Sequence, residues 1–164
     1  EPELETYLIQ ECSVAPEQAP GMAHLAQGSF LNIEKQLSAR NDADKFLEYF
    51  ITLMRQAYQR KIGLLRKWSV DVAGLGREGS MRFLAYCERM MRENFITNLR
   101  IPGLVYLNQD EETFSRKFSP FINERNVERL LNEFESARLD ISANGNAKII
   151  FFDLAVKVIL LLKQ

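Results

Sequence analysis

Residues 149–162 read IIFFDLAVKVILLL, and this stretch decides how the rest of the chain must pack. At 3.6 residues per turn, its apolar side chains cover nearly the whole circumference of a helix and leave a thin strip marked by Asp153 and Lys157. Such a helix must be buried on most sides. It is either the central helix of a bundle or a helix covered partly by its own domain and partly by another subunit, and the sequence is compatible with both. A bilayer span needs roughly 20 apolar residues, so this shorter stretch predicts no membrane contact.

Turn residues divide the rest of the chain into further helical segments. Apolar residues recur at three- and four-residue spacing between these turns, and alternating β-branched runs are few. The sequence therefore predicts an all-α fold. The expected segments are three short helices before residue 40, a pattern from about 42 to 60 that extends through 72, and helices near 78–99, 108–118, 123–142 and 147–163.

A polar run from Ser38 to Asp44 predicts a boundary between two helical domains. Residues 1–40 are expected to form a small three-helix unit. Residues 41–164 are expected to form a helical bundle, in which Asn41 or Asp42 can cap the first helix.

The composition excludes several functional classes. The 21 Lys and Arg residues nearly balance 22 Asp and Glu, so the net charge of -1 creates no bulk field that attracts nucleic acid or anionic lipid. His24 is the single histidine, and Cys12 and Cys87 lie far apart without a metal-binding spacing. We therefore expect a chain with no catalytic residues, no metal, no cofactor and no small-molecule ligand. The low cysteine content is typical of a reducing cytoplasm.

Residues 74–79 read GLGREG and match the GxGxxG pattern of dinucleotide-binding loops. That pattern works by joining a strand to a helix, so that the pyrophosphate meets the helix N-terminus. Here a helical pattern through Trp68 and Val72 precedes the glycines. The segment is therefore predicted to be a turn between two helices.

The segment between Glu48 and Asp71 contains cations and aromatic residues but no acidic residue. One interpretation is a contact with a nucleic-acid backbone or with an acidic partner surface. The favoured interpretation is a solvated face whose Trp68 lies in the core, because the chain has no bulk positive charge. The candidate residues for the DNA or acidic-partner contact are Arg60, Lys61, Arg66 and Lys67.

Several blocks of sequence resemble one known family. They are FLAY at 83–86, RENF at 92–95, KFSPFINERN at 117–126, NAKI at 146–149 and AHLAQGSF at 23–30. Together they resemble the delta prime subunit of the bacterial DNA polymerase III clamp loader. The last block resembles the A-x-L-A-x-G-N/S-F helix-turn-helix in the lid of clamp-loader AAA+ modules, with Gly28 at the sharp turn. Pro20-Gly21 departs from the unbroken lid helix of the family.

The resemblance implies that residues 1–40 are part of an AAA+ lid domain and that residues 41–164 are the collar domain. In clamp loaders, the collars of five subunits form a ring that holds the ATPase modules. The likeness covers about the C-terminal half of the family protein, so we expect a non-catalytic fragment whose nucleotide-binding module would precede Glu1. The parent would be a subunit of a DNA-directed DNA polymerase holoenzyme that supports ATP-dependent loading of the sliding clamp. The implied partners are the cytoplasmic delta and gamma/tau subunits, with DNA reached only through the complex.

We expect the subunit interface on the last helix and on the segment around Pro120, which cannot continue a helix. The candidate interface residues are Phe118, Phe121, Ile122, Phe152, Val156 and Ile159. Another hypothesis is a self-contained helical adaptor or homodimer without a replication role, in which the same last helix makes a two-fold contact. An α-helical enzyme has little support, because acids, histidines and nucleophiles are not concentrated anywhere in the chain.

Overall fold

The computed structural model describes residue 16 and residues 30–101 and 103–163, with only the backbone for residues 30–41. The chain divides into two compact units, residues 1–45 and residues 46–164. The first two expected helices, the AHLAQGSF block up to Ser29, His24 and Cys12 lie outside the described residues.

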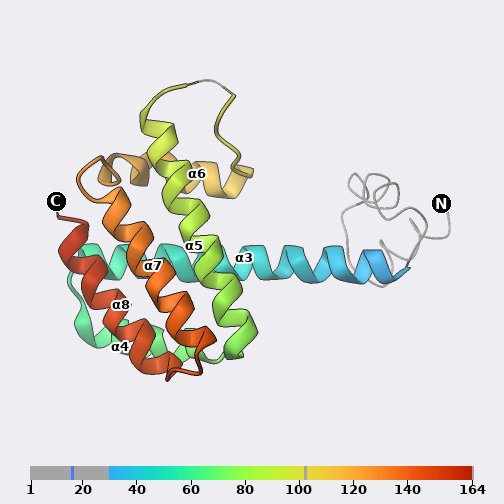
Figure 1. The fold of residues 1–164 in the computed structure, drawn as a ribbon. Helices are drawn as coiled ribbons and strands as arrows, with labels where there is room; N and C mark the ends of the chain where they lie inside the picture. Colours follow the sequence, from blue (N-terminus) through green and yellow to red (C-terminus); the bar gives the residue numbers. More distant parts are fainter. Residues whose placement is uncertain (1–15, 17–29, 102, 164) are drawn as a thin grey trace. The chain divides into compact units, whose positions relative to one another are not determined.

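The described residues form six α-helices and no strand, which confirms the all-α prediction (Figure 1). The elements are α3 (Phe30–Tyr58), α4 (Ile62–Ala73), α5 (Gly76–Asn98), α6 (Gln109–Phe118), the 3-10 turn η1 (Ser119–Phe121), α7 (Val127–Ser142) and α8 (Ala147–Leu161).

The polar run at 38–44 does not interrupt a helix, contrary to the expectation from sequence. Helix α3 continues through it, because the run contains neither Gly nor Pro and each residue can keep its backbone hydrogen bond. The chain instead turns at Arg60, whose φ of 55° is left-handed. The apolar pattern that extends through residue 72 is therefore shared by two helices, α3 and α4.

The helix ends follow the capping chemistry of the sequence in two places. Asn108 accepts from the backbone N–H of Glu111, and the Glu111 carboxylate accepts from the backbone N–H of Asn108, which completes a capping box. Asn146 caps α8 by accepting from the N–H of Ile149 at 3.2 Å. Asn144 has a φ of 64°, and this left-handed residue ends α7 just before the cap of α8.

The two glycine turns are tight. A Cβ at Gly145 would lie 2.8 Å from the carbonyl oxygen of Asp140, so a side chain there would collide with the end of α7. Gly76 has a φ of +77° and links α4 directly to α5. Two helices flank the GxGxxG pattern, which confirms the predicted turn between helices.

Helix α7 begins at Val127, four residues later than the sequence suggested. The side-chain oxygen of Asn126 accepts from the backbone N–H of Asn123 at 2.9 Å, and this bond closes a turn before the helix. The Asn123 carbonyl then accepts from the backbone N–H of Val127 at 3.0 Å. Residues 123–126 are therefore a hydrogen-bonded turn and not a first helical turn.

Helix α5 packs along α7, and α8 lies between α4 and α7 (Figure 1). The second half of α3 crosses this layer, where its Phe46 lies 5.6 Å from the ring of Phe83 in α5. Phe83 also lies 6.1 Å from Phe151 of α8, so one buried ring joins three helices. Trp68 is 3% exposed and donates to the carbonyl of Tyr49 at 3.0 Å. Trp68 is thus a core residue, as the favoured interpretation of the basic segment predicted.

Candidate subunit interface

Helix α8 presents an apolar face to solvent although most of its surface is buried. Its other sides belong to the core through Phe151, Leu154, Ala155, Val158, Ile159 and Leu161. Ile149 is 66% exposed and Leu160 is 65% exposed, and Phe152 and Val156 are half-buried between them. The spacing of three, four and four residues places these four side chains on one face of the helix. We call Ile149, Phe152, Val156 and Leu160 the α8 stripe.

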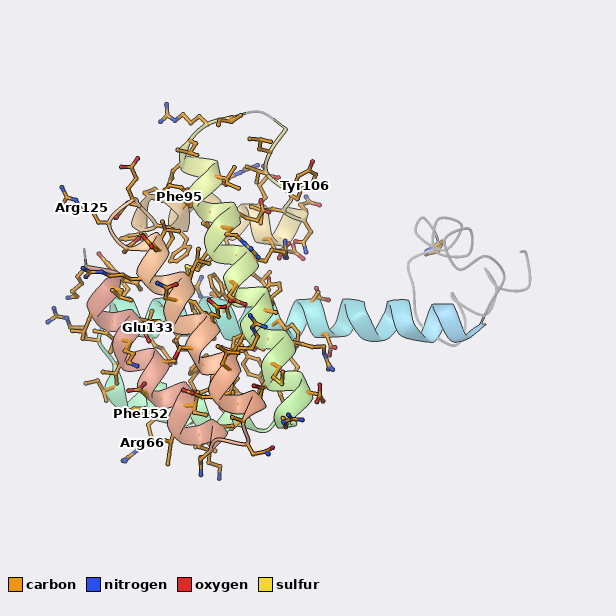
Figure 2. All side chains as sticks on the ribbon, in the orientation of Figure 1. Arg66, Phe95, Tyr106, Arg125, Glu133 and Phe152 are labelled. Carbon is orange, nitrogen blue, oxygen red and sulfur yellow. The ribbon has the colours of Figure 1, made fainter. Side chains whose placement is uncertain are left out.

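The α8 stripe is bordered by charges from two neighbouring helices. On the α7 side, Lys157 lies 3.2 Å from Glu133 and 2.8 Å from Asp153. Hydrogen bonds to these two carboxylates raise the pKa of Lys157. On the α4 side, the guanidinium of Arg66 lies 5.9 Å from the centre of the Phe152 ring (Figure 2). An apolar strip with a charged rim is the arrangement typical of a protein-protein interface.

The six residues predicted for the interface do not lie on one surface. Phe118, Ile122 and Ile159 are buried in the core of their own chain, at 7%, 0% and 8% exposure. Phe152 and Val156 belong to the α8 stripe, and Phe121 is 38% exposed on η1. The structure therefore brings two of the six together and leaves Phe121 on a separate surface.

The sequence analysis missed Ile149 and Leu160, the two most exposed residues of the α8 stripe. A usable signal was present, because Asp153 and Lys157 mark the outward side of the helix. Ile149 lies four residues before Asp153 and Leu160 lies three residues after Lys157, so both lie on the same side of the helix as these charges. Ile159 lies 100° away from Leu160 on the wheel and therefore points inward.

The position of Phe121 depends on the buried side chain of Asn126. The side-chain amide nitrogen of Asn126 donates to the carbonyl of Phe121 at 2.8 Å and to the carbonyl of Leu161 at 3.1 Å. Asn98 holds the same turn from α5, donating to the carbonyls of Ser119 and Ile122 at 2.5 Å. Residues 119–126 are therefore an irregular segment in which the carbonyl groups of Ser119, Phe121 and Ile122 accept from two asparagines.

Replacing Asn126 with Ala should lower the free energy of unfolding by about 1–3 kcal/mol, because two buried carbonyl groups lose their donor. Asn126→Asp is a useful comparison, since it keeps an oxygen for the N–H of Asn123 but removes the amide donor. In urea denaturation, both Asn126→Ala and Asn126→Asp should have a lower unfolding midpoint than the parent chain. A midpoint equal to that of the parent for both variants would mean that the turn does not depend on Asn126.

Helix α6, which precedes this turn, is fixed to α5 by a buried carboxylate. Glu111 is 2% exposed, accepts from the hydroxyl of Tyr86 at 2.8 Å and pairs with Arg89. Burial and this hydrogen bond raise the pKa of Tyr86 far above its ordinary value. The Glu111 carboxylate is held by Tyr86 and Arg89, so Glu111 is a structural residue.

The four basic candidate residues lie on the turn before α4 and on α4 itself, and all are exposed. Arg66 packs over Phe152, so it borders the α8 stripe. Arg60 and Lys61 lie in the turn, and Lys67 lies on the exposed side of α4. They are accessible to a partner, but Trp68, the aromatic residue that follows Lys67, is buried and cannot stack on a base.

In the part of the chain that the structure describes, no group of three His, Cys, Asp or Glu side chains is arranged to hold a metal ion. Among the same residues, no helix has the length and apolarity needed to cross a membrane. Comparison with models of protein families, with curated proteins and with solved structures found no match.

Proposed function

We propose that this chain is a non-catalytic collar fragment of a DNA polymerase III clamp-loader delta prime subunit. In this role it binds the collars of the delta and gamma/tau subunits and supports ATP-dependent loading of the sliding clamp during replication. The α8 stripe is the observation that carries the proposal. It is the surface through which a helical bundle of this kind would join a ring of similar bundles.

The energetics of the α8 stripe favour association. Full burial of a large aliphatic or aromatic side chain contributes about 1.5–3 kcal/mol, and two of the four side chains keep about two thirds of their surface exposed. Covering the stripe would therefore contribute several kcal/mol. A stable interface buries about 800 Å² per partner, so the stripe would be its centre and the charged residues beside it would form the rim.

The residues of the delta prime-like blocks have structural roles consistent with this proposal. Phe83 and Leu84 of FLAY are in the core, Asn126 of KFSPFINERN fastens η1 to α8, and Asn146 of NAKI caps α8. These residues set the position of α8, on which the α8 stripe lies. The likeness and the stripe therefore concern the same part of the molecule.

Mixing the chain with purified delta and gamma/tau subunits tests the proposal. Size-exclusion chromatography with light scattering should give a complex whose mass includes one copy of the chain, and the chain alone should be a monomer. A chain that forms a dimer alone and ignores both subunits would contradict the collar role. That result would instead support the homodimeric adaptor.

Replacing Lys61 and Lys67 together with Glu should leave DNA binding by the assembled complex unchanged, because DNA is reached only indirectly through other subunits. These two residues are suitable because Arg66 packs on the α8 stripe and would disturb assembly. The measurement is DNA binding by the complex across a salt series. If either lysine contacts a phosphate, the slope of log binding constant against log salt concentration will fall in the double variant by about one counterion for each lysine in contact.

A further inference from the structure

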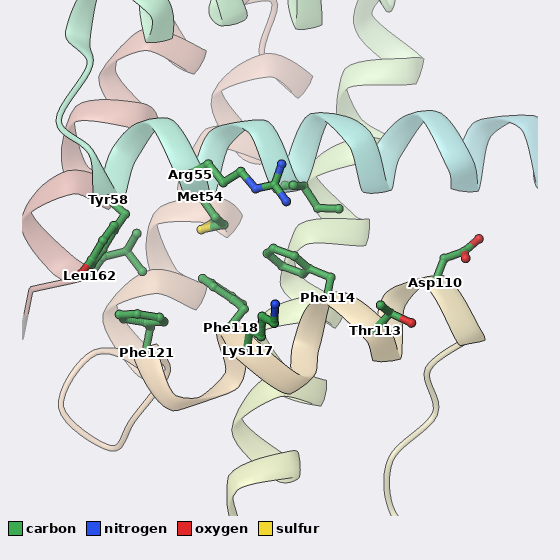
Figure 3. A pocket seen from close by; sticks show the side chains of 11 residues that line it. Met54, Arg55, Tyr58, Asp110, Thr113, Phe114, Lys117, Phe118, Phe121 and Leu162 are labelled. Atoms are coloured by element: carbon green, nitrogen blue, oxygen red, sulfur yellow. The ribbon is translucent and has the colours of Figure 1, made fainter.

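A second apolar surface lies between α3, α6 and η1, on a different side of α8 from the α8 stripe. It is a groove of about 480 Å³ (Figure 3). Met54, Phe118 and Leu162 form its buried floor. Leu162 is two residues beyond Leu160, a rotation of about 200° around the helix, so one partner can cover the stripe without filling the groove. We call this surface the α3–α6 groove.

The mouth of the α3–α6 groove is formed by an exposed aromatic pair. The rings of Tyr58 and Phe121 lie 5.1 Å apart in an edge-on arrangement, and Tyr58 is 58% exposed. Inside, Phe114 stacks on Phe118 with a centroid distance of 5.0 Å. Aromatic rings that line a concave apolar surface offer a large contact area at low cost in conformational entropy, as in grooves that bind peptides.

Two cations lie along this groove. Arg55 extends from α3, and Lys117 extends from α6 on the opposite wall (Figure 3). Both side chains are exposed, and neither makes an ion pair with another of the described residues. Asp110 lies at the far end from Tyr58 and Phe121, in the first turn of α6, where the helix N-terminus favours its charge. A carboxylate between the two walls would meet two cations, whereas an incoming cation would be repelled by them.

We infer that the α3–α6 groove binds a short acidic amphipathic segment of a partner protein. Apolar side chains of that segment would cover Phe114 and Phe121, and its carboxylates would lie between Arg55 and Lys117. A nucleic-acid strand fits less well, because it needs a continuous track of cations and this groove has two cations and an acidic residue. The inference rests on this groove alone and does not require the clamp-loader role.

Fluorescence anisotropy with a synthetic peptide tests the inference on the full chain. The probe is a fluorescein-labelled peptide with Leu and Phe at helical spacing and Asp and Glu at the other positions. We expect saturable binding that weakens as salt is added. A peptide with Lys in place of its acids, and one with Ser in place of its apolar residues, should bind at least about tenfold more weakly.

Two groove variants and one control locate the binding. Lys117→Glu and Phe121→Ala should each weaken binding by about tenfold, because one reverses a charge on the wall and the other removes half of the aromatic mouth. Lys148→Glu makes the same change of net charge on an exposed residue outside the groove and should bind like the parent chain. Thermal melting of Lys117→Glu and Lys148→Glu should match that of the parent, since both side chains are exposed. Phe121→Ala should melt at a modestly lower temperature, because its ring is 38% exposed and also contacts Phe118, and circular dichroism checks that this variant is folded during the binding measurement.

The inference would be overturned by any of four results. They are an acidic peptide that shows no saturable binding, a Lys peptide that binds as tightly as the acidic one, groove variants that bind the acidic peptide as tightly as the parent chain does, and displacement of the peptide by oligothymidylate. A groove variant that lowers the mass of the chain in solution would also overturn it, because the occupant would then be a second copy of this chain.

Discussion

Replacing Ile159 with Glu should unfold the chain or lower its free energy of unfolding by about 4 kcal/mol or more. Ile159 is 8% exposed and belongs to the core, so the variant loses apolar packing and places a carboxylate among apolar side chains. A loss of this size is a large part of the roughly 5–15 kcal/mol that stabilises a typical domain. Urea denaturation followed by circular dichroism measures it.

The adjacent residue provides a matched control. Leu160→Glu introduces the same group one position along the helix, where the parent side chain is 65% exposed. This variant should unfold within about 1 kcal/mol of the parent chain, because its carboxylate stays in water and Lys157 is nearby. Equal loss of stability in Ile159→Glu and Leu160→Glu would show that the inward and outward faces of α8 have been assigned wrongly.

The second large effect concerns assembly. Replacing Ile149 and Leu160 together with Glu should weaken binding to the delta and gamma/tau subunits by about a hundredfold or more, because two carboxylates would be buried in the interface without partners. The folded state should remain, since both side chains are exposed in the free chain. Isothermal titration with each subunit gives the dissociation constants, and thermal melting gives the stability.

Leu139→Glu is the control for the assembly experiment. Leu139 is an exposed apolar residue of α7, at 56%, and it lies outside the α8 stripe. Its replacement adds one carboxylate to the surface and should leave assembly unchanged. If Leu139→Glu and the Ile149/Leu160 double variant weaken assembly equally, the loss reflects general surface charge and the α8 stripe is not the interface.

Local signals in the sequence predicted most helix ends. Asn108 with Glu111, and Asn146 with the N–H of Ile149, act through short-range hydrogen bonds that the sequence spacing already specifies. The polar run at 38–44 was misleading, because polarity signals exposure and not a helix break. The turn at Arg60 was missed because nothing in the sequence marks it. A left-handed φ at a residue other than glycine carries no sequence signal.

The candidate site could be predicted only in part. An almost wholly apolar helix reveals that it is buried but gives little indication of which side faces its own chain, because its apolar pattern has weak periodicity. Phe118, Ile122 and Ile159 were therefore grouped with Phe152 and Val156, although tertiary packing buries the first three. The α3–α6 groove joins residues more than 100 positions apart, and no local pattern predicts such a surface.

Solvent access to position 160 in the assembled complex is the most direct test of the central claim that another subunit covers the α8 stripe. The measurement uses a Leu160→Cys chain in which Cys12 is replaced by Ser. Cys87 can remain, because it is fully buried and burial raises the pKa of its thiol well above the ordinary value, which keeps it unreactive. The rate of maleimide labelling is compared between the free chain and its complex with the delta and gamma/tau subunits.

We expect rapid labelling of Cys at position 160 in the free chain and labelling at least about tenfold slower in the complex, where the thiol is removed from solvent. A Leu139→Cys chain with the same Cys12 replacement should label at the same rate in both states. Equal rates for position 160 in the free chain and in a complex of verified mass would contradict the account.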